Sequence, residues 1–187
     1  MTTPTKPAAA PTTATEPEMP PQPQVGDRAP DFSLPDDEGT VRRPADARGR
    51  WLVLYFYPKD DTAGCTIEAC EFRDAKTDID ERDAEVWGVS VLGTGSKAAF
   101  KRKFNLPFHL LADEDHAVAE KYGTWVQKQN YGRTYMGVRR STFLVDPDGV
   151  IARTWPRVKA EGHAAEVLAA LDEERAGRPS RSAKFET

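Results

Sequence analysis

The sequence predicts an α/β fold in three layers, with a mixed central sheet flanked by helices. Three observations lead to this prediction. Residues Trp51–Tyr57 form a continuous apolar run, which is typical of a strand buried on both faces of a sheet. Beyond this run, helix-like and strand-like segments alternate as in a βαβ unit. Late in the chain, the turn sequence Asp146–Gly149 joins two further strands as a hairpin, and a last helix-like segment follows.

Each element follows in chain order from its own pattern. The apolar run at 51–57 should be central in the sheet, because a strand at the edge would expose one side to water. The later segments repeat their apolar residues at a spacing near either 3.6 or 2. We expect helices at 63–80 and Gly95–Phe104 around a strand at Ala84–Ser90, a helix at Asp113–Tyr122 whose Ala117, Val118 and Ala119 face the core, a loop rich in Gly, Asn and Tyr, strands at Ser141–Val145 and Val150–Trp155, and a helix at Glu161–Leu171.

The length of 187 residues predicts one domain, which we place at 25–171 between two polar tails. Residues 1–24 hold seven of the 15 prolines, and we expect this tail to be disordered because it has too little apolar surface to offset the entropy of ordering. Residues 172–187 are rich in charge and predict a second tail. Since residues 1–24 lack the apolar core of a secretory signal, we expect a cytoplasmic protein.

The composition argues against a nucleic-acid or membrane partner. The formal net charge is -4 and the isoelectric point is near 5.5, whereas a nucleic-acid partner usually requires a basic face. No stretch approaches the roughly 18 consecutive apolar residues of a membrane span. Lys97, Lys101, Arg102 and Lys103 do cluster, but they alternate with apolar residues. We interpret them as the solvated face of an amphipathic helix.

The sequence predicts no metal, haem or flavin cofactor. His109, His116 and His163 are scattered without the spacing of metal ligands, and we expect them to be solvated or to cap helices. Two cysteines five residues apart supply too few ligands for a closed metal site.

Cys65 and Cys70 are the only cysteines in the chain. Because Pro58 ends the apolar strand and a helix-compatible segment follows a turn-rich stretch, Cys65 should lie in the first turn of a helix. Unpaired backbone N–H groups and the positive end of the helix dipole stabilise an anion there, which favours the reactive thiolate. The sequence therefore predicts redox chemistry, although either cysteine taken alone could instead be a small core residue.

The residues leading to Cys65 resemble the peroxiredoxins. The spacing Pro58-x-x-x-Thr62-x-x-Cys65 is similar to the signature of that family. Residues Phe56–Thr62, Gly64–Thr66 and Cys70 resemble its bacterioferritin comigratory protein, or peroxiredoxin Q, group, whose members often carry Pro where this chain has Ala63. The resemblance spans Val25 to Leu171 and implies a thioredoxin-like fold, which the order of the elements also favours. Three further segments agree with that group, namely Ala29–Phe32, Leu111–Asp113 and Arg140–Asp146.

The resemblance implies a thiol peroxidase in which Cys65 attacks hydrogen peroxide or a small organic hydroperoxide. Thr62 is expected to cap the helix through its hydroxyl and to present that hydroxyl to the substrate. Arg140 is expected to stabilise the thiolate and polarise the peroxide, with its neighbour Arg139 pointing elsewhere. Pro58 is expected to shield the thiolate.

Three carboxylates near Cys65 oppose this activation. Asp60, Asp61 and Glu68 disfavour a thiolate by like charge, so the net effect on the thiol depends on whether they are more exposed than Arg140, which the sequence leaves open.

The resemblance also implies how the reaction would be completed. Attack on peroxide converts Cys65 to a sulfenic acid, and Cys70, as the only other thiol, is expected to form a disulfide with it. On an intact helix these residues are separated by about 7.5 Å of rise and about 140° of rotation, whereas the Cα atoms of a disulfide lie within about 7 Å. The helix must therefore unwind around 65–71. The family implies thioredoxin or a glutaredoxin as the reductant, and we expect a monomer.

Other interpretations remain open. A thioredoxin-like disulfide oxidoreductase is disfavoured because its cysteines are normally separated by two residues and not four. A redox sensor or holdase would use the oxidised, remodelled segment to bind a partner. Thr62 and Pro58 could simply begin the helix, and Arg140 could belong to a surface ion pair. We place Trp125 and the loop 127–135 at the rim of the site by family position.

Overall fold

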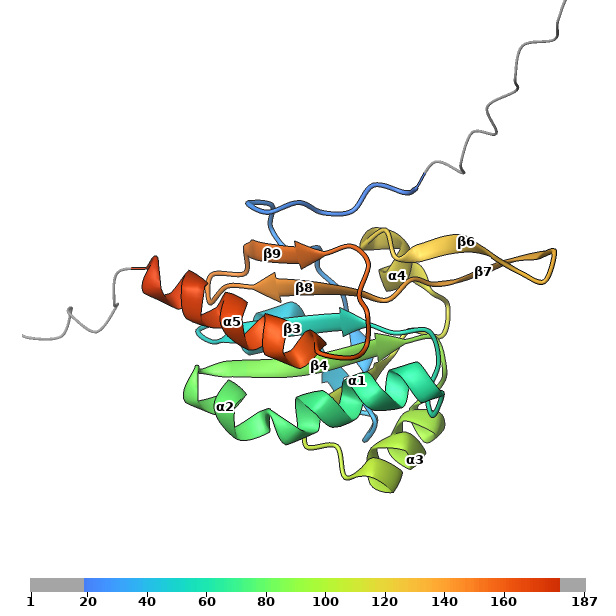
Figure 1. Cartoon of the computed structure of the whole chain (residues 1–187), viewed down its shortest axis with the longest axis horizontal. Helices are drawn as coiled ribbons and strands as arrows, with labels where there is room; N and C mark the ends of the chain where they lie inside the picture. Colours follow the sequence, from blue (N-terminus) through green and yellow to red (C-terminus); the bar gives the residue numbers. More distant parts are fainter. Residues whose placement is uncertain (1–18, 179–187) are drawn as a thin grey trace, which may run out of the picture.

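The computed structural model describes residues 19–178 and confirms the predicted α/β class (Figure 1). The central sheet has five strands in the order β5-β4-β3-β8-β9. β3 pairs with β4 and β4 with β5 in parallel, whereas β3 pairs with β8 and β8 with β9 in antiparallel, so the sheet is mixed as expected. Its strands are β3 (Trp51–Phe56), β4 (Ala84–Ser90), β5 (His109–Ala112), β8 (Ser141–Val145) and β9 (Ile151–Trp155).

Helices and short ladders complete the fold around this sheet. α1, α2 and α5 lie together on one face of the sheet, with α3 beside them (Figure 1). The helices are α1 (Ala63–Asp74), α2 (Lys76–Glu81), α3 (Thr94–Phe104), α4 (Ala117–Lys121), α5 (His163–Ala176) and the 3₁₀ turn η1 (Pro44–Ala47). The remaining strands form two small antiparallel ladders, β1 (Leu34–Pro35) with β2 (Val41–Arg42), and β6 (Trp125–Asn130) with β7 (Arg133–Val138).

Strand β3 is the middle strand, and all six of its residues are buried. Because side chains alternate along a strand, it contributes to two hydrophobic cores. Val53 and Tyr55 join the core beneath α1, α3 and α5, which contains Phe72. Leu54 and Phe56 join the core on the other face. The strand is therefore fixed from both sides, and the loop that follows it starts from a rigid position.

Three helix boundaries differ from the sequence prediction. The helix expected at 63–80 is divided at Ala75 into α1 and α2. The helix expected at 113–122 begins only at Ala117, because the buried carboxylate of Asp113 accepts the N–H groups of Val118 and Ala119 and so caps α4. Ala117 is exposed, so the prediction that it faces the core is wrong. α5 continues to Ala176, so the start of the tail predicted at 172–187 is helical. Residues 1–18 and 179–187 of the two predicted tails lie outside the described residues.

The segment predicted as a loop after α4 forms the β6–β7 hairpin, which extends beyond the central sheet (Figure 1). Asn130 pairs with Arg133, which leaves a two-residue turn made by Tyr131 and Gly132. Both have positive φ, 48° and 77°, as a type I′ turn requires. The sequence prediction missed the hairpin because Tyr occupies a position where Asn or Asp is the usual signal.

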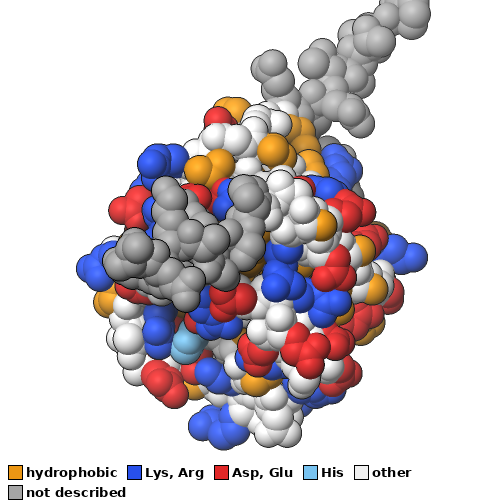
Figure 2. Space-filling view, turned by 90° about the vertical axis from the view of Figure 1, so that its left-hand side faces the viewer, with side chains coloured by type: hydrophobic (Ala, Val, Ile, Leu, Met, Phe, Trp, Pro, Cys, Tyr) orange, Lys and Arg blue, Asp and Glu red, His pale blue; other side chains and the backbone are white. Residues whose placement is uncertain are grey.

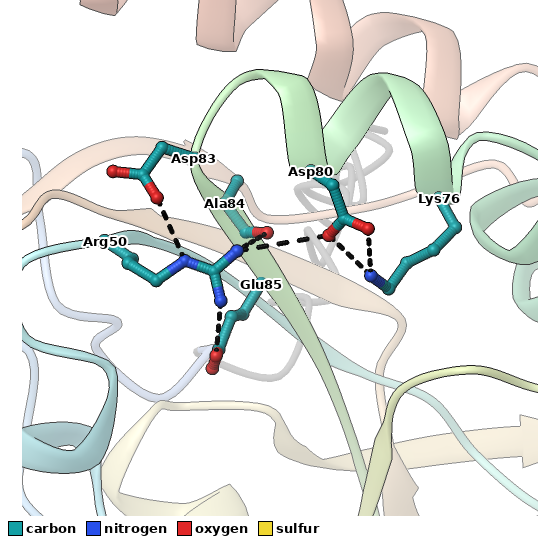
Figure 3. A network of polar contacts seen from close by, with 6 residues as sticks. All are labelled: Arg50, Lys76, Asp80, Asp83, Ala84 and Glu85. Carbon is teal, nitrogen blue, oxygen red and sulfur yellow. Dashed lines mark hydrogen bonds and ion pairs between the residues drawn. The ribbon is translucent and has the colours of Figure 1, made fainter.

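A network of ion pairs joins the beginnings of β3 and β4 to α2 (Figure 3). Arg50 donates from Nε to Asp83 at 3.1 Å and from Nη1 to Glu85 at 2.7 Å. Its Nη2 lies 4.0 Å from Asp80, which also pairs with Lys76 at 2.5 Å. Exposed pairs of this kind each stabilise a protein by about 1 kcal/mol or less. The network lies at the end of β3 opposite to Cys65 and is therefore separate from the surroundings of that thiol.

The distribution of charge on the surface matches the similar numbers of basic and acidic residues in the chain. Figure 2 shows basic and acidic side chains interspersed over one face, without a broad area of either sign. Within residues 19–178, no helix combines the length and the apolar character needed to cross a membrane.

Candidate active site

Cys65 lies where the sequence predicts, in the first turn of a helix. β3 ends at Phe56, and the chain passes through half-buried Pro58 to Thr62, which is the N-cap residue of α1. Cys65 is the third residue of α1 and is 1% exposed. Cys70 lies on the same helix and is partly buried, and both thiols are free. Cys65 therefore lies in the turn of α1 whose N–H groups have no partner within the helix, a position that favours a thiolate.

Arg140 reaches this sulfur from the connection between β7 and β8. Its Nη2 lies 3.3 Å from Sγ of Cys65, and its Nη1 pairs with Glu68 of α1. Gly64 leaves space for this approach, since a Cβ at that position would lie 3.0 Å from Nη2 and the guanidinium would have to shift by a few tenths of an ångström. The neighbouring Arg139 instead directs its Nη1 at the sulfur of Met19. The structure thus brings Arg140 and not Arg139 to Cys65, as predicted.

Glu68 is less exposed than Arg140, since its side chain is fully buried while that of Arg140 is 16% exposed. Burial raises the pKa of Glu68 to about 7, although the charge of Arg140 and its hydrogen bond act in the opposite direction. Asp60, whose side chain is 2% exposed, is also less exposed than Arg140, whereas Asp61 is more exposed at 44%. The question that the sequence leaves open is therefore answered differently for Asp61 than for Glu68 and Asp60.

Lys97 contradicts its prediction, because its side chain is fully buried and does not belong to a solvated face. It pairs with Asp60, with Nζ 2.9 Å from Oδ2. Burial lowers the pKa of Lys97, and the charge of Asp60 opposes that shift. The sequence spacing could have predicted this burial, since Lys97 lies three and seven residues before Phe100 and Phe104 and therefore shares their side of α3.

Thr62 has the predicted position but a different hydrogen bond. It is the N-cap residue of α1, yet its side chain makes no capping bond. Its Oγ1 donates instead to the carbonyl of Lys59 at 2.9 Å. The prediction of a hydroxyl cap is therefore wrong. Because the donated hydrogen is directed at the loop, the oxygen lone pairs remain available as acceptors.

Lys128 is a basic residue near the site that the sequence analysis did not single out. It lies on β6 within the segment predicted at the rim. Burial and the charge of Arg140 lower its pKa, while Cys65 opposes this shift. Lys128 therefore lies within electrostatic range of both groups.

The histidines form no metal site in residues 19–178, where no group of three or more potential ligands is close enough to hold an ion. His163 is 1% exposed and shares a 2.8 Å hydrogen bond with Oγ1 of Thr142. The prediction that it is solvated or capping is wrong, because its ring packs edge-on against Phe72 and Trp155.

Several known proteins are similar to this chain. The AhpC/TSA family matches residues 25–154. A putative peroxiredoxin bcp of Coxiella burnetii is 48% identical over 148 residues, covering 79% of this chain and 98% of that protein. Peroxiredoxin Bcp of Bacillus subtilis is 46% identical, covering 79% of this chain and 94% of that protein. A solved structure of Xanthomonas campestris peroxiredoxin Q has a TM-score of 0.73 at 38% identity and covers 76% of this chain and 90% of that one.

The matched segment contains both halves of the site, Thr62 and Cys65 at the start of α1 and Arg140 before β8. The thioredoxin-like fold, the buried cysteine at a helix N-terminus and the sequence identities all agree. The chain therefore belongs to the AhpC/TSA family and, within it, to the Bcp peroxiredoxins, which are thiol peroxidases.

Proposed function

We propose that this peroxiredoxin reduces hydrogen peroxide and small organic hydroperoxides with Cys65 as the peroxidatic residue and Cys70 as the resolving residue. The observation that carries the proposal is the 3.3 Å contact between Nη2 of Arg140 and Sγ of Cys65 in the first turn of α1. A fixed cation and a helix N-terminus both stabilise the thiolate, which is the nucleophile. The bacterioferritin comigratory protein of Xanthomonas campestris, whose solved structure is 37% identical to this chain, has alkyl peroxide reduction activity.

In the proposed first step, the Cys65 thiolate attacks one oxygen of the peroxide and the O–O bond breaks. The second oxygen leaves as hydroxide or alkoxide and takes up a proton, and Cys65 becomes a sulfenic acid. Arg140 would stabilise the negative charge that develops on the leaving oxygen. Thr62 would accept a hydrogen bond from the peroxide O–H, and Pro58 would limit the access of water to the thiolate.

In the second step, the Cys70 thiol displaces water from the sulfenic acid to form the Cys65–Cys70 disulfide. Because both residues lie on α1, this step requires the helix to unwind between them. An external dithiol then reduces the disulfide, and thioredoxin or a glutaredoxin is the reductant we propose. The cycle suits a monomer in a reducing compartment such as the cytoplasm, where thiols are kept reduced.

The test is the consumption of hydrogen peroxide by the reduced protein with thioredoxin, thioredoxin reductase and NADPH. We expect turnover by the parent protein and none by Cys65→Ser. Cys70→Ser should consume one equivalent, accumulate the sulfenic acid and fail to recycle. If Cys70→Ser recycles normally, the resolving role is wrong while the peroxidatic role stands. If the parent consumes no peroxide but reduces insulin disulfides, the disulfide oxidoreductase interpretation replaces the proposal.

A further inference from the structure

Lys97 and Asp60 form a buried ion pair beside the loop that leads to Cys65. Nζ of Lys97 lies 2.9 Å from Oδ2 and 3.2 Å from Oδ1 of Asp60, and 2.5 Å from Oγ of Ser90. Asp60 also accepts hydrogen bonds from Oη of Tyr57 at 2.5 Å and from Oγ of Ser96 at 2.7 Å. The ammonium and the carboxylate are therefore both supplied with partners from the protein.

Stability alone does not account for such a pair. Removing two charges from water costs several kcal/mol per ion, and apolar residues of similar volume often give an equally stable protein. A network whose members are all satisfied does, however, fix the position of each member. The value of this pair therefore lies in the geometry that it imposes.

The network holds Asp60 from three elements. Tyr57 directly follows β3, Ser90 ends β4, and Ser96 and Lys97 lie in the first turn of α3. These elements belong to the rigid sheet and its covering layer. The loop is thus fixed at a point two residues before Thr62, the N-cap of α1.

The backbone after Asp60 transmits this position to the helix. Asp61 has a φ of 56°, in the left-handed region that non-glycine residues seldom adopt. Thr62 returns to extended geometry with φ -98° and ψ 158°, and α1 begins at Ala63. A turn of this shape leaves few alternative directions for the first turn of α1. The location of Asp60 therefore restricts where Thr62 and Cys65 can lie relative to Arg140.

We propose that Lys97 is a positioning residue for peroxide reduction, acting through Asp60 to hold Thr62 and Cys65 in the geometry that the attack on the O–O bond requires. The proposal rests on the peroxidatic role proposed for Cys65. In-line attack is sensitive to placement, and a displacement of about 1 Å can slow such a step by about 100-fold.

The main test uses a charge-neutral removal of the pair, Lys97→Met with Asp60→Asn, in the Cys70→Ser background so that only Cys65 reacts. The matched control is Arg82→Met with Asp172→Asn, which removes a solvent-facing pair between the end of α2 and α5 and does not involve the loop before Cys65. Each protein is reacted with hydrogen peroxide and, separately, with iodoacetamide, which requires the thiolate but not the placement of a peroxide. We expect the peroxide rate constant to fall by about tenfold or more and the alkylation rate to stay within about threefold. The control should match the parent in both reactions.

Hydrogen exchange of the amides at 58–66 provides an independent measurement. We expect faster exchange in the Lys97/Asp60 variant than in the parent and in the control, because the loop has lost its anchor. An unchanged peroxide rate, or alkylation that slows in parallel with peroxide reduction, would overturn the positioning role. If the parent protein is alkylated but does not react with peroxide, the proposed function fails. Unchanged hydrogen exchange at 58–66 would separately contradict the claim that Lys97 and Asp60 anchor the loop. Should the double variant not fold, Lys97→Arg, which keeps the charge, is expected to retain more peroxide activity than Lys97→Met.

Discussion

The guanidinium of Arg140 contacts Sγ of Cys65 through Nη2 at 3.3 Å while its Nη1 pairs with the buried Glu68. A single planar cation therefore serves both a thiol and a carboxylate of the same helix, three residues apart. The planar arrangement of its donors fixes their directions, which a lysine ammonium does not reproduce.

Arg140→Lys should therefore lower kcat/KM for hydrogen peroxide by about 100-fold, which is the usual effect of removing one donor to a developing negative charge. Steady-state rates with saturating reductant measure this. Arg139→Lys provides the matched control, because Arg139 points toward Met19 and not toward Cys65, and its rate should be that of the parent. Equal losses in the two variants would contradict the assignment of Arg140.

Gly64→Ala tests the space that Arg140 needs. A Cβ at this position would lie 3.0 Å from Nη2, so the guanidinium must shift by a few tenths of an ångström to accommodate it and its contact with the thiol is perturbed. We expect a fall in kcat/KM of about tenfold, together with an unchanged or slightly raised stability, because alanine is the better helix former. Gly95→Ala is the control, since a Cβ there meets nothing within 4 Å in α3. Matching peroxide rates in the two variants would show that Gly64 is not required for the position of Arg140.

The sequence predicts the framework of this site because the framework depends on local patterns. β3 is recognisable because both of its faces are buried, and Cys65 can be assigned to a helix N-terminus because Pro58 and the turn-rich stretch separate strand from helix. Arg140 could be expected at the site only through the family resemblance, since it is 75 residues from Cys65.

The features that the sequence does not predict concern charged residues whose surroundings are set by tertiary packing. Lys97 and Glu68 are polar residue types that normally remain exposed, and each is buried because a partner distant in sequence neutralises it. For Lys97 that partner is Asp60, and for Glu68 it is Arg140. Composition and periodicity describe one element at a time and so do not reveal such pairs.

The buried Glu68 predicts a particular dependence of stability on pH. Its pKa is about 7 in the folded protein, whereas an unfolded Glu titrates near pH 4.5. Because its pKa is higher in the folded state, the folded protein binds this proton more tightly than the unfolded chain does. The free energy of unfolding therefore falls as pH rises from about 4.5 to 7, by at most about 3 kcal/mol. Above pH 7 this loss of stability is complete.

Glu68→Gln cannot ionise and should remove this decline. Urea unfolding of reduced protein between pH 5 and 8 should show the stability of the variant, relative to the parent, improving as pH rises. The exposed Glu81→Gln, at the end of α2, serves as the control and should follow the parent at every pH. A variant with the same pH dependence as the parent would mean that Glu68 does not titrate in this range.

Glu71 connects α1, the helix that must unwind, with the start of α5. The N–H of Gly162 donates to its carboxylate, at 2.9 Å from Oε1 and 3.0 Å from Oε2. Since Glu71 directly follows Cys70, formation of the proposed disulfide would disturb this contact. Glu71→Gln weakens the bond in the reduced helical state at a cost of about 1 kcal/mol, the typical value of a helix cap. We therefore expect disulfide formation after one equivalent of peroxide to accelerate by about fivefold, with the preceding attack on peroxide unchanged.

Stopped-flow tryptophan fluorescence, with quenched samples analysed by mass spectrometry, resolves these two steps. Glu161→Gln removes an exposed charge one residue before Gly162 without touching α1, and it should leave both rates as in the parent. If Glu71→Gln leaves disulfide formation at the parental rate, the unwinding stops before Glu71 and the contact with Gly162 persists in the oxidised protein. If both steps accelerate together, the contact restrains Cys65 as well as Cys70, and the segment that moves extends to the N-terminal turn of α1.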